Sequence, residues 1–586
     1  MLPPLLTTTD KERYPLYWQQ KTQQVQALLS CGIALGAVAH SDTSHSLIAK
    51  LSEPTQKLIY KAIAEIHQLQ QDTLPQGALS QSTLQQGAFP QSMRPQESLR
   101  PETAAANEAT VTSAKPDTQA PKTSTNTLRL QKLIQDLVDL QQSEEAAATQ
   151  TASDVWWLQP EIAQSPLLKD WAQLTPELFS SPPEHYRMRA EFAIYHQDEE
   201  RIDYAMFEPG SKPRKMILIQ DFPGCTKAIN EAMAWLREHL GAYPELKHKL
   251  FEVDFLCNTA GNVVITLHYH KKLADTWQEA AADLLRRHAP SAPPAKLPIP
   301  TASTKLDQIK TQSTASSIES SQDDPHATAA ELTPYRYSLV AHARKQTFKV
   351  GPDFVVETIP TNAGLIYLKQ VEGTFSQPNA NACKDMLNFA LSAATLGYVP
   401  GTDAASAEAS ASTAASATAT AAATARADDL IELYCGSGTF TVALAPYFRK
   451  VFATELARVP TATAVYNMKL NQRSNIKLAR LSALEVTQAI NQEREFHRLA
   501  EQEINLADYD FRTTLIDPPR AGLHDQAALA FTQQFDRIIY ISCGPAALAA
   551  DLAVLTQTHA IKKIAFFDQF PYTHHLESGI FLERRS

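Results

Sequence analysis

The sequence of 586 residues lacks the marks of several protein classes. Its six cysteines lie far apart and no two stand at C-x-x-C spacing, which excludes a compact zinc or iron–sulfur motif and argues against a secreted disulfide framework. No stretch approaches about 18 consecutive apolar residues, the length that a membrane-spanning helix needs. The opening residues also lack the basic segment and apolar run of a signal peptide. These absences predict a cytoplasmic protein with no metal site and no membrane contact.

The net charge excludes less than the cysteine pattern does. At −10, it does not suggest a protein that binds nucleic acid. A sum over the whole chain can hide a local basic face, however, so charge alone leaves the partner open. The length is too great for one hydrophobic core and predicts two or three folded units.

Three segments contain too few bulky apolar side chains to offset the entropy lost on ordering. They are residues 71–127, 289–332 and 401–427. The first two are rich in polar residues and proline, and the third is dominated by alanine. We interpret all three as flexible insertions and assign no function to them.

From residue 428 onward, short apolar runs alternate with helical segments. The runs are "LIELY", "KVFATE", "TTLID", "RIIYIS" and "IKKIAFFD". This rhythm is typical of βαβ units and predicts a doubly wound α/β domain with helices on both faces of the sheet. Because ligands of such sheets bind at the carboxyl ends of the strands, the residues that follow each run are the candidates for a site.

The stretch "LYCGSGTF" places Gly436 and Gly438 in a turn between a strand and a helix. Glycines there let the backbone approach a ligand closely, although an ordinary turn is the alternative reading. Glu455 ends the next strand and can accept hydrogen bonds from both ribose hydroxyls of an adenosine cofactor. Thr441 stands where the third glycine of a dinucleotide fingerprint would fall, so S-adenosylmethionine fits better than NAD.

Three further groups follow strands of the same domain. Asp517 precedes two prolines in "LIDPPR", which stiffen its loop. Cys543 follows "RIIYIS", and the helix that begins near Pro545 predicts a lowered thiol pKa. Glu577 enters the last apolar run and is a candidate proton-transfer group. A buried structural thiol is the alternative for Cys543, but its place at the edge with Asp517 favours chemistry.

These motifs resemble a known family. "LYCGSGTF", "DPPR", "YISC" and "FPYTHHLESG" are similar to motifs of the RNA uracil-5-methyltransferases, above all the bacterial tRNA (uracil-5-)-methyltransferases. "SPPEHYRMRAEF", "HKLFEVDFL", "LHYHKKL" and "TFSQPNA" are similar to the N-terminal half of those enzymes. The resemblance covers about 176–287 and 333–586, with a short helix near 14–30.

The resemblance implies a Rossmann-like S-adenosylmethionine methyltransferase domain beside an α+β RNA-binding domain. The expected division of the chain is an N-terminal helical segment (1–70), a second helical segment (128–175), the RNA-binding domain (176–288 and 333–375) and the methyltransferase domain (376–400 and 428–586), separated by the three insertions.

The resemblance also implies roles for single residues. Cys543 is similar to the nucleophile that adds to C6 of uracil, and Glu577 to the base that removes the C5 proton. The residues similar to cofactor contacts are Gln377, Tyr434, Gly436, Gly438, Thr439, Glu455 and Asp517. Phe251 and His270 are similar to RNA-contacting residues of the N-terminal half. From side-chain chemistry alone, we also expect Tyr269 to stack on RNA bases and Arg187 and Arg189 to contact phosphates. Thr439 and Gly544 each replace an asparagine of the family pattern.

The implied activity is methylation of C5 of uridine 54 in the tRNA T-loop, which gives 5-methyluridine through a covalent cysteine–C6 adduct. The implied partners are the T-arm of tRNA and transfer-messenger RNA, with no iron–sulfur cluster and no obligate protein partner. Three alternatives stay open. They are a ribosomal RNA uracil-5-methyltransferase, an RNA-binding or tRNA-folding protein with secondary methylation, and a small-molecule methyltransferase.

Overall fold

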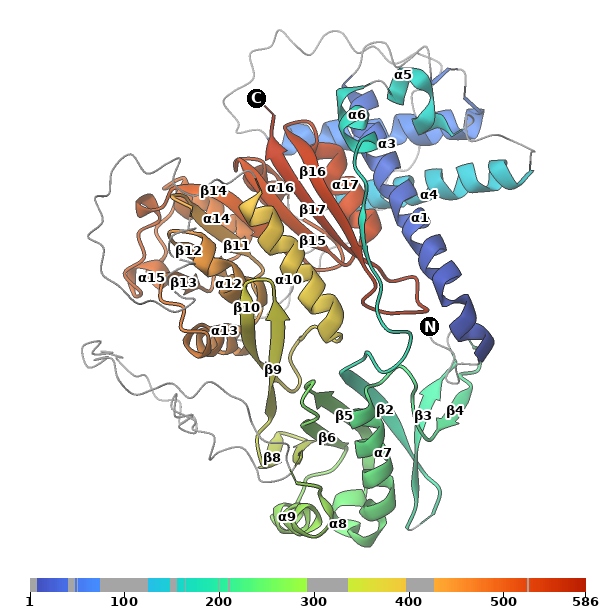
Figure 1. Ribbon diagram of the computed structural model, residues 1–586, viewed down its shortest axis with the longest axis vertical. Coiled ribbons are helices and arrows are strands. Elements are labelled where there is room, and N and C mark those ends of the chain that lie inside the picture. Colours follow the sequence, from blue (N-terminus) through green and yellow to red (C-terminus); the bar gives the residue numbers. More distant parts are fainter. Residues whose placement is uncertain are drawn as a thin grey trace, which may run out of the picture.

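A computed structural model describes most of the chain (Figure 1). The described residues are 8–40, 48–49, 51–73, 125–147, 155–163, 165–198, 200–208, 211–291, 336–396, 426–523 and 526–585. The three insertions predicted from composition lie largely outside these ranges. No helix in the described part of the chain is both long and apolar enough to cross a membrane.

The C-terminal half is built on an eight-stranded sheet in the order β1-β16-β17-β15-β14-β11-β12-β13. Its strands are β1 (Glu177–Phe179), β11 (Asp429–Leu433), β12 (Val451–Thr454), β13 (Ile476–Ala479), β14 (Phe511–Ile516), β15 (Arg537–Ser542), β16 (His559–Phe567) and β17 (Glu577–Arg584). β11 to β15 are parallel, and β17 is antiparallel to both of its neighbours. The predicted doubly wound α/β domain is confirmed.

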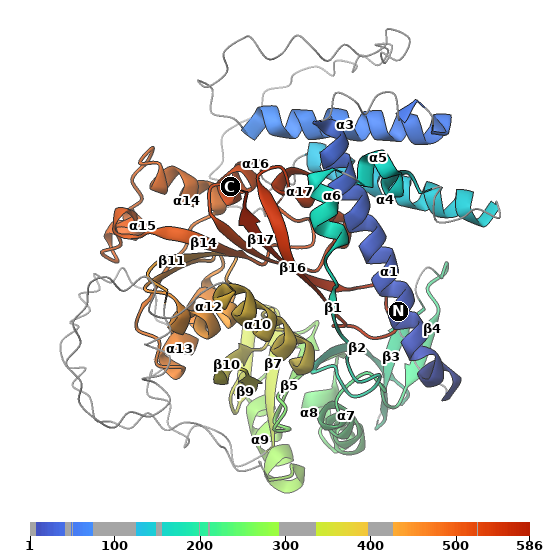
Figure 2. The same cartoon turned by 45° about the horizontal axis from the view of Figure 1, so that its top comes forward.

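Helices cover both faces of this sheet because its central strands are buried on both sides. Leu430 packs with α10 (Ala380–Thr395) and α12 (Thr439–Leu444), with α13 (Arg458–Leu470) beside them. Its neighbour Ile431 points to the opposite face, which α14 (Ala483–Ile490), α15 (His497–Ala500), α16 (Gln526–Thr532) and α17 (Pro545–Leu555) cover. Figures 1 and 2 show the two helical layers with the sheet between them.

A second sheet has seven strands in the order β4-β3-β2-β5-β6-β7-β8. They are β2 (Arg189–His196), β3 (Ile202–Phe207), β4 (Met216–Ile219), β5 (Leu250–Cys257), β6 (Val263–Tyr269), β7 (Tyr337–Ala343) and β8 (Gln346–Val350). One face packs on α7 (Lys227–His239), α8 (Pro244–Lys247) and α9 (Thr276–His288). This unit is the α+β domain that the resemblance implied.

The hairpin of β9 (Phe354–Thr361) and β10 (Gly364–Val371) joins the two sheets (Figure 1). Near its start, Val355 packs on apolar residues of the seven-stranded sheet. Further along, Ile359 and Ile366 belong to the apolar cluster of α10 and the eight-stranded sheet. The hairpin therefore shares side chains with the cores of both domains.

The N-terminal helices lie over α17 and α16 (Figure 2). They are α1 (Thr8–Ala39), α3 (Glu53–Thr73), α4 (Thr125–Ala147), α5 (Pro160–Ala163) and α6 (Pro166–Ala172). The backbones of α1 and α17 touch. A Cβ atom at Gly32 would lie 2.2 Å from the Ala549 carbonyl oxygen, and one at Gly36 would lie 2.4 Å from the Ala553 carbonyl oxygen. Only glycine fits at these two positions of α1.

We expect Gly32→Val to destabilise the protein by about 1–3 kcal/mol, because the new side chain overpacks the contact with Ala549. Urea denaturation followed by tryptophan fluorescence measures the change. Ala37→Val adds the same side chain type to the same helix at a half-buried position and is the matched control. Equal midpoints for the two variants would contradict the close helix contact.

Candidate active site

The candidate residues gather at the carboxyl edge of the parallel strands. The order is the G-x-G turn after β11, Glu455 after β12, Asp517 after β14 and Cys543 after β15. Glu577 reaches the same edge from the opposite direction, because it is the first residue of the antiparallel β17. Ser542 pairs with Ser578, so Cys543 and Glu577 occupy neighbouring ends of adjacent strands.

The turn after β11 has left-handed backbone conformations at Gly436 and Gly438, with φ of +56° and +78°. A Cβ atom at Gly438 would press on Ala464, whereas one at Gly436 would meet open space. The Gly436 N–H donates to Glu455 Oε2 at 3.1 Å, and the Ala457 N–H donates to Oε1 at 2.7 Å. The turn is therefore open on one side, and backbone donors fix the Glu455 carboxylate beside it.

This arrangement suits the ribose of S-adenosylmethionine. A carboxylate offers about four lone-pair sites, and the two backbone donors occupy one on each oxygen of Glu455. Both oxygens keep capacity for the two adjacent ribose hydroxyls. Tyr434, with φ of +61°, begins the turn, and Thr439 begins the helix that follows it. The residues present therefore fit the cofactor that the sequence predicted.

Gln377 lies in the loop between β10 and α10. Gln569 Nε2 donates to Gln377 Oε1 at 2.5 Å. Asn379 accepts from backbone N–H groups at the start of α10 and donates to the Gln569 carbonyl oxygen. These bonds fix the Gln377 loop against the segment that leads to Glu577.

Cys543, Asp517 and Glu577 influence one another's protonation. Burial raises the pKa of Asp517 to about 7. Burial and then the Asp517 carboxylate raise the pKa of Glu577 to about 8, against opposing effects of Arg520 and Lys21. Burial, followed by the carboxylates of Glu577 and Asp517, raises the pKa of the Cys543 thiol to about 12. All three groups therefore hold their protons more strongly than usual.

The raised thiol pKa overturns our expectation that the helix after Cys543 lowers it. That helix does begin at Pro545. Its effect is outweighed because the thiol is partly buried and two carboxylates lie near it. The sulfur becomes a nucleophile when a neighbouring group takes its proton or when the negative charge around it falls.

Phe251 and His270 form a stacked ring pair on the seven-stranded sheet, with centroids 3.8 Å apart and planes at 4°. Tyr269 does not join them. Its side chain is 4% exposed, and its hydroxyl donates to the Leu246 carbonyl oxygen at 2.6 Å and accepts from Trp277 Nε1 at 3.0 Å. Neighbouring residues of an extended chain point to opposite faces, so Tyr269 belongs to the core. Its predicted contact with RNA is wrong.

The two candidate arginines lie where the domains meet. The Arg187 guanidinium carbon is 5.5 Å from the centre of the Phe570 ring, and Phe570 follows β16 of the other sheet. Arg189 donates to the Thr374 carbonyl oxygen in the loop after β10. Both side chains are partly buried, so each keeps some surface for a phosphate while it also links the domains.

Two cations near the site were not predicted from the sequence. Arg520 follows the prolines of the "DPPR" motif, and its charge opposes the raised pKa values of Cys543 and Glu577. Lys21 of α1 also opposes the raised pKa of Glu577. Arg520 stands within a motif and could have been found there. No local pattern marks Lys21, whose ion-pair partner Asp568 is 547 residues away.

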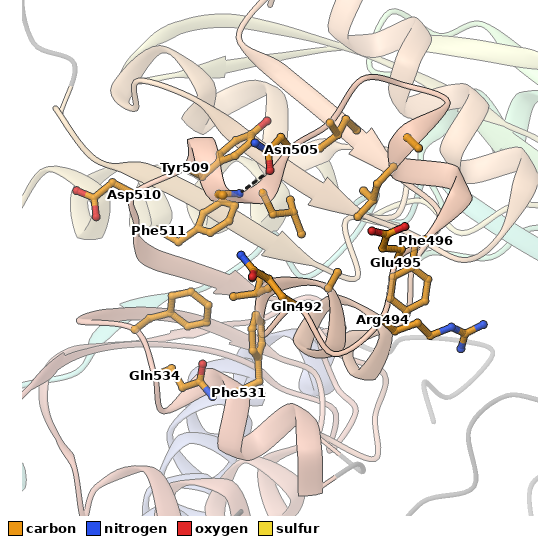
Figure 3. Close-up of a pocket in the computed structure, with 18 residues that line it drawn as sticks. Gln492, Arg494, Glu495, Phe496, Asn505, Tyr509, Asp510, Phe511, Phe531 and Gln534 are labelled. Carbon is orange, nitrogen blue, oxygen red and sulfur yellow. Dashed lines mark hydrogen bonds between the residues drawn. The ribbon is translucent and has the colours of Figure 1, made fainter.

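A separate cavity of about 950 Å³ lies near the amino ends of β14 and β15 (Figure 3). Its wall includes Tyr509 and Phe511, whose rings stack at 4.8 Å. Phe496 and Arg494 line it from the side of α15. None of the predicted site residues lines this cavity, so it is distinct from the site at the carboxyl edge.

The strand order, the glycine turn and the acidic residue after the next strand define a doubly wound methyltransferase domain, here joined to an α+β domain. The sequence matches the family described as tRNA (Uracil-5-)-methyltransferase over residues 160–292, 319–397 and 409–585. The chain belongs to this family.

Two curated relatives are similar over most of their length. The tRNA/tmRNA (uracil-C(5))-methyltransferase of Ectopseudomonas mendocina (strain ymp) is 39% identical over 419 residues, which cover 72% of this chain and 93% of the relative. The enzyme of the same description from Acinetobacter baumannii (strain AYE) is 39% identical over 419 residues, covering 71% and 94%. Among solved structures, the Pyrococcus abyssi tRNA (uracil-54, C5)-methyltransferase in complex with S-adenosyl-L-homocysteine matches 71% of this chain and 81% of its own at 17% identity, with a TM-score of 0.42.

We expect Asp517→Asn and Glu577→Gln each to lower the thiol pKa, since each removes a negative charge near Cys543. Alkylation of Cys543 by iodoacetamide at pH 8 should become about three- to tenfold faster. Peptide mass spectrometry measures the rate, and the fully buried Cys225 is the internal control. An unchanged rate at Cys543 in both variants would show that the carboxylates do not govern the thiol.

Phe251→Ala should weaken binding of a tRNA transcript about tenfold, because it removes one ring of the stacked pair. Tyr269→Phe should leave the affinity unchanged and cost about 1 kcal/mol of stability through its lost hydroxyl bonds. Filter binding and urea denaturation measure the two effects. If Tyr269→Phe weakened tRNA binding and Phe251→Ala did not, Tyr269 would contact RNA, contrary to its buried position.

Proposed function

We propose that this protein methylates C5 of uridine 54 in the T-loop of tRNA. As a member of its family it is a tRNA uracil-5-methyltransferase that uses S-adenosylmethionine, and the choice of the T-loop uridine is our assignment. The observation that carries the proposal is the position of Cys543 and Glu577 on adjacent strand ends, beside Asp517. The T-arm of tRNA and the comparable arm of transfer-messenger RNA are the proposed substrates.

The cofactor supplies an electrophilic methyl group. Glu455 is proposed to bind the ribose hydroxyls, because both of its oxygens are held in place and keep lone pairs free. Gly436 and Gly438 allow the backbone to approach the cofactor closely. The other proposed contacts are Gln377, Tyr434, Thr439 and Asp517.

The target base must first leave its stack. A loop nucleotide needs less disruption than a paired one, and a stacked ring pair can contact neighbouring bases or take the place of the displaced one. Phe251 and His270 are proposed for this role, with Arg187 and Arg189 at backbone phosphates. These contacts select a folded RNA loop over a free nucleotide.

Uracil C5 is a poor nucleophile until a group adds at C6. The Cys543 sulfur forms a bond to C6, and the electron pair of the C5–C6 double bond moves into an enolate. The thiol proton has to leave at this step. We assign it to Asp517, whose pKa of about 7 leaves part of the population ionised at neutral pH.

The last step restores the aromatic base. Once C5 carries both a methyl group and a hydrogen, Glu577 removes that proton, the double bond re-forms and the bond from sulfur to C6 breaks. Cys543 leaves as a thiolate and regains a proton. Because burial raises the pKa of Glu577 to about 8, the carboxylate is a stronger base than an ordinary glutamate.

The test is transfer of labelled methyl from S-adenosylmethionine to an unmodified tRNA transcript, followed by mapping of the modified base. We expect 5-methyluridine at position 54 with the wild-type protein and none with Cys543→Ala. Glu577→Gln should instead accumulate an RNA–protein adduct that survives denaturing electrophoresis, since proton removal is blocked.

A ribosomal RNA fragment and a transfer-messenger RNA transcript serve as parallel substrates. Preferential methylation of the ribosomal fragment would show that ribosomal RNA is the preferred substrate and would contradict the tRNA assignment. Cofactor binding without transfer to any of the three RNAs would favour a tRNA-folding role. If the Cys543→Ala protein still methylated RNA, the reaction would not need a covalent adduct with Cys543.

A further inference from the structure

The long helix α1 contributes side chains to the segment that leads to Glu577. α1 lies outside the residues that match the family description, which begin at 160. Its C-terminal part is held against α17 by the contacts of Gly32 and Gly36, and the first residue of α17 follows Cys543 by two positions. The N-terminal part of α1, which carries Tyr14 and Lys21, therefore has a defined place relative to the sheet edge that carries Cys543 and Glu577. Figure 1 shows the course of α1 past the sheet.

Lys21 and Tyr14 of α1 bind the same carboxylate. Lys21 Nζ lies 2.6 Å from Asp568 Oδ1, and its side chain is 7% exposed while that of Asp568 is 1% exposed. The Tyr14 hydroxyl donates to Asp568 Oδ2 at 2.5 Å. Lys21 Nζ also donates to the Phe570 carbonyl oxygen at 3.2 Å. Because several hydrogen bonds hold these two buried groups, the ion pair between Lys21 and Asp568 is fixed in a single arrangement.

Asp568 is adjacent to the base in space. It follows Phe567, the last residue of β16, and Phe567 pairs with Glu577 across the antiparallel ladder. The Asp568 N–H donates to the Phe179 carbonyl oxygen of β1, which fixes its backbone as well. Lys21 consequently reaches the segment at the point where it leaves the strand beside Glu577.

The charged groups around Glu577 come from α1 and three loops at the sheet edge, and they include the Asp568 carboxylate with which Lys21 pairs. Asp517 after β14 and Cys543 after β15 disfavour a second negative charge. Arg520 in the loop after Asp517 favours it, but this side chain is exposed to solvent and can move. His575 is held neutral, because burial and then nearby cations lower its pKa to about 4. Lys21 is the buried cation of the set, held in place by Asp568.

We propose that Lys21 is a positioning residue for Glu577, in that it anchors the segment from 568 to 576 and places a fixed positive charge near the base, which increases the fraction of the base in its carboxylate form. Burial lowers the pKa of Lys21, and the Asp568 carboxylate opposes that effect. The first step of the reaction does not require Lys21. The proton-removal step does, because a protonated Glu577 cannot accept the C5 hydrogen. This inference rests on the proposed function.

The test compares Lys21→Met with wild type in single-turnover methylation of tRNA between pH 6 and pH 10. Loss of the cation should move the rising limb of the rate upward by about one pH unit. At pH 7 the rate should fall about tenfold and the denaturation-stable RNA–protein adduct should increase. At pH 9 the rate should approach that of wild type. Lys21→Arg should restore the wild-type profile.

Lys57→Met is the matched control, since it removes a surface lysine that pairs with an exposed glutamate in α3. Lys21→Met leaves a buried carboxylate unpaired and can fail to fold, so Lys21→Met combined with Asp568→Asn is the second variant. We expect it to fold and to show a smaller shift in the same direction, because the Asp568 carboxylate is removed together with the Lys21 cation while the segment from 568 to 576 still loses its anchor. A wild-type pH profile and adduct level in either folded variant would overturn the inference and leave the proposed function intact. Absence of 5-methyluridine with the wild-type protein would overturn both.

Discussion

Burial of three acidic groups at one sheet edge, reinforced by repulsion between them, raises their pKa values. Cys543, Asp517 and Glu577 lie at one sheet edge, and each negative charge makes the next ionisation harder. Such acidic groups keep their protons more strongly in the absence of substrate, and one group loses its proton before the next as the local charge changes. The proposed covalent addition and the proposed proton removal need opposite protonation states of these groups, so the crowding matches a reaction in which one proton moves before the next.

The closeness of these three groups depends on the antiparallel direction of β17. Four parallel strands, β11, β12, β14 and β15, lead into the glycine turn, Glu455, Asp517 and Cys543 at the carboxyl edge, but a parallel strand in the place of β17 would start at the other edge. Because β17 runs antiparallel, its first residue lies beside the end of β15. The hairpin of β9 and β10 shares side chains with the cores of both domains, so it links this edge to the sheet that carries the stacked pair of Phe251 and His270.

The sequence predicts much of this arrangement because the relevant signals are local. Alternating apolar runs located the strands, and strand ends located Glu455, Asp517 and Cys543. The prediction for Tyr269 failed because it rested on the stacking ability of an aromatic ring and ignored the alternation of strand faces. The thiol pKa failed because its causes are residues distant in sequence, and Lys21 went unseen because nothing around it marks an ion pair with Asp568. Sequence patterns do not predict electrostatic interactions between residues that lie far apart in the chain.

The ion pair between Lys21 and Asp568 has a consequence for how the protein is made on the ribosome. α1 is synthesised early, yet its partner emerges 547 residues later. The Lys21 amine and the side of α1 that packs on α17 have no native partners during that interval, and closing so large a loop is slow. Nascent chains therefore cannot form the ion pair between Lys21 and Asp568 until almost all of the protein has been translated. Until then α1 depends on α3 and α4, or on chaperones, to cover its apolar surface.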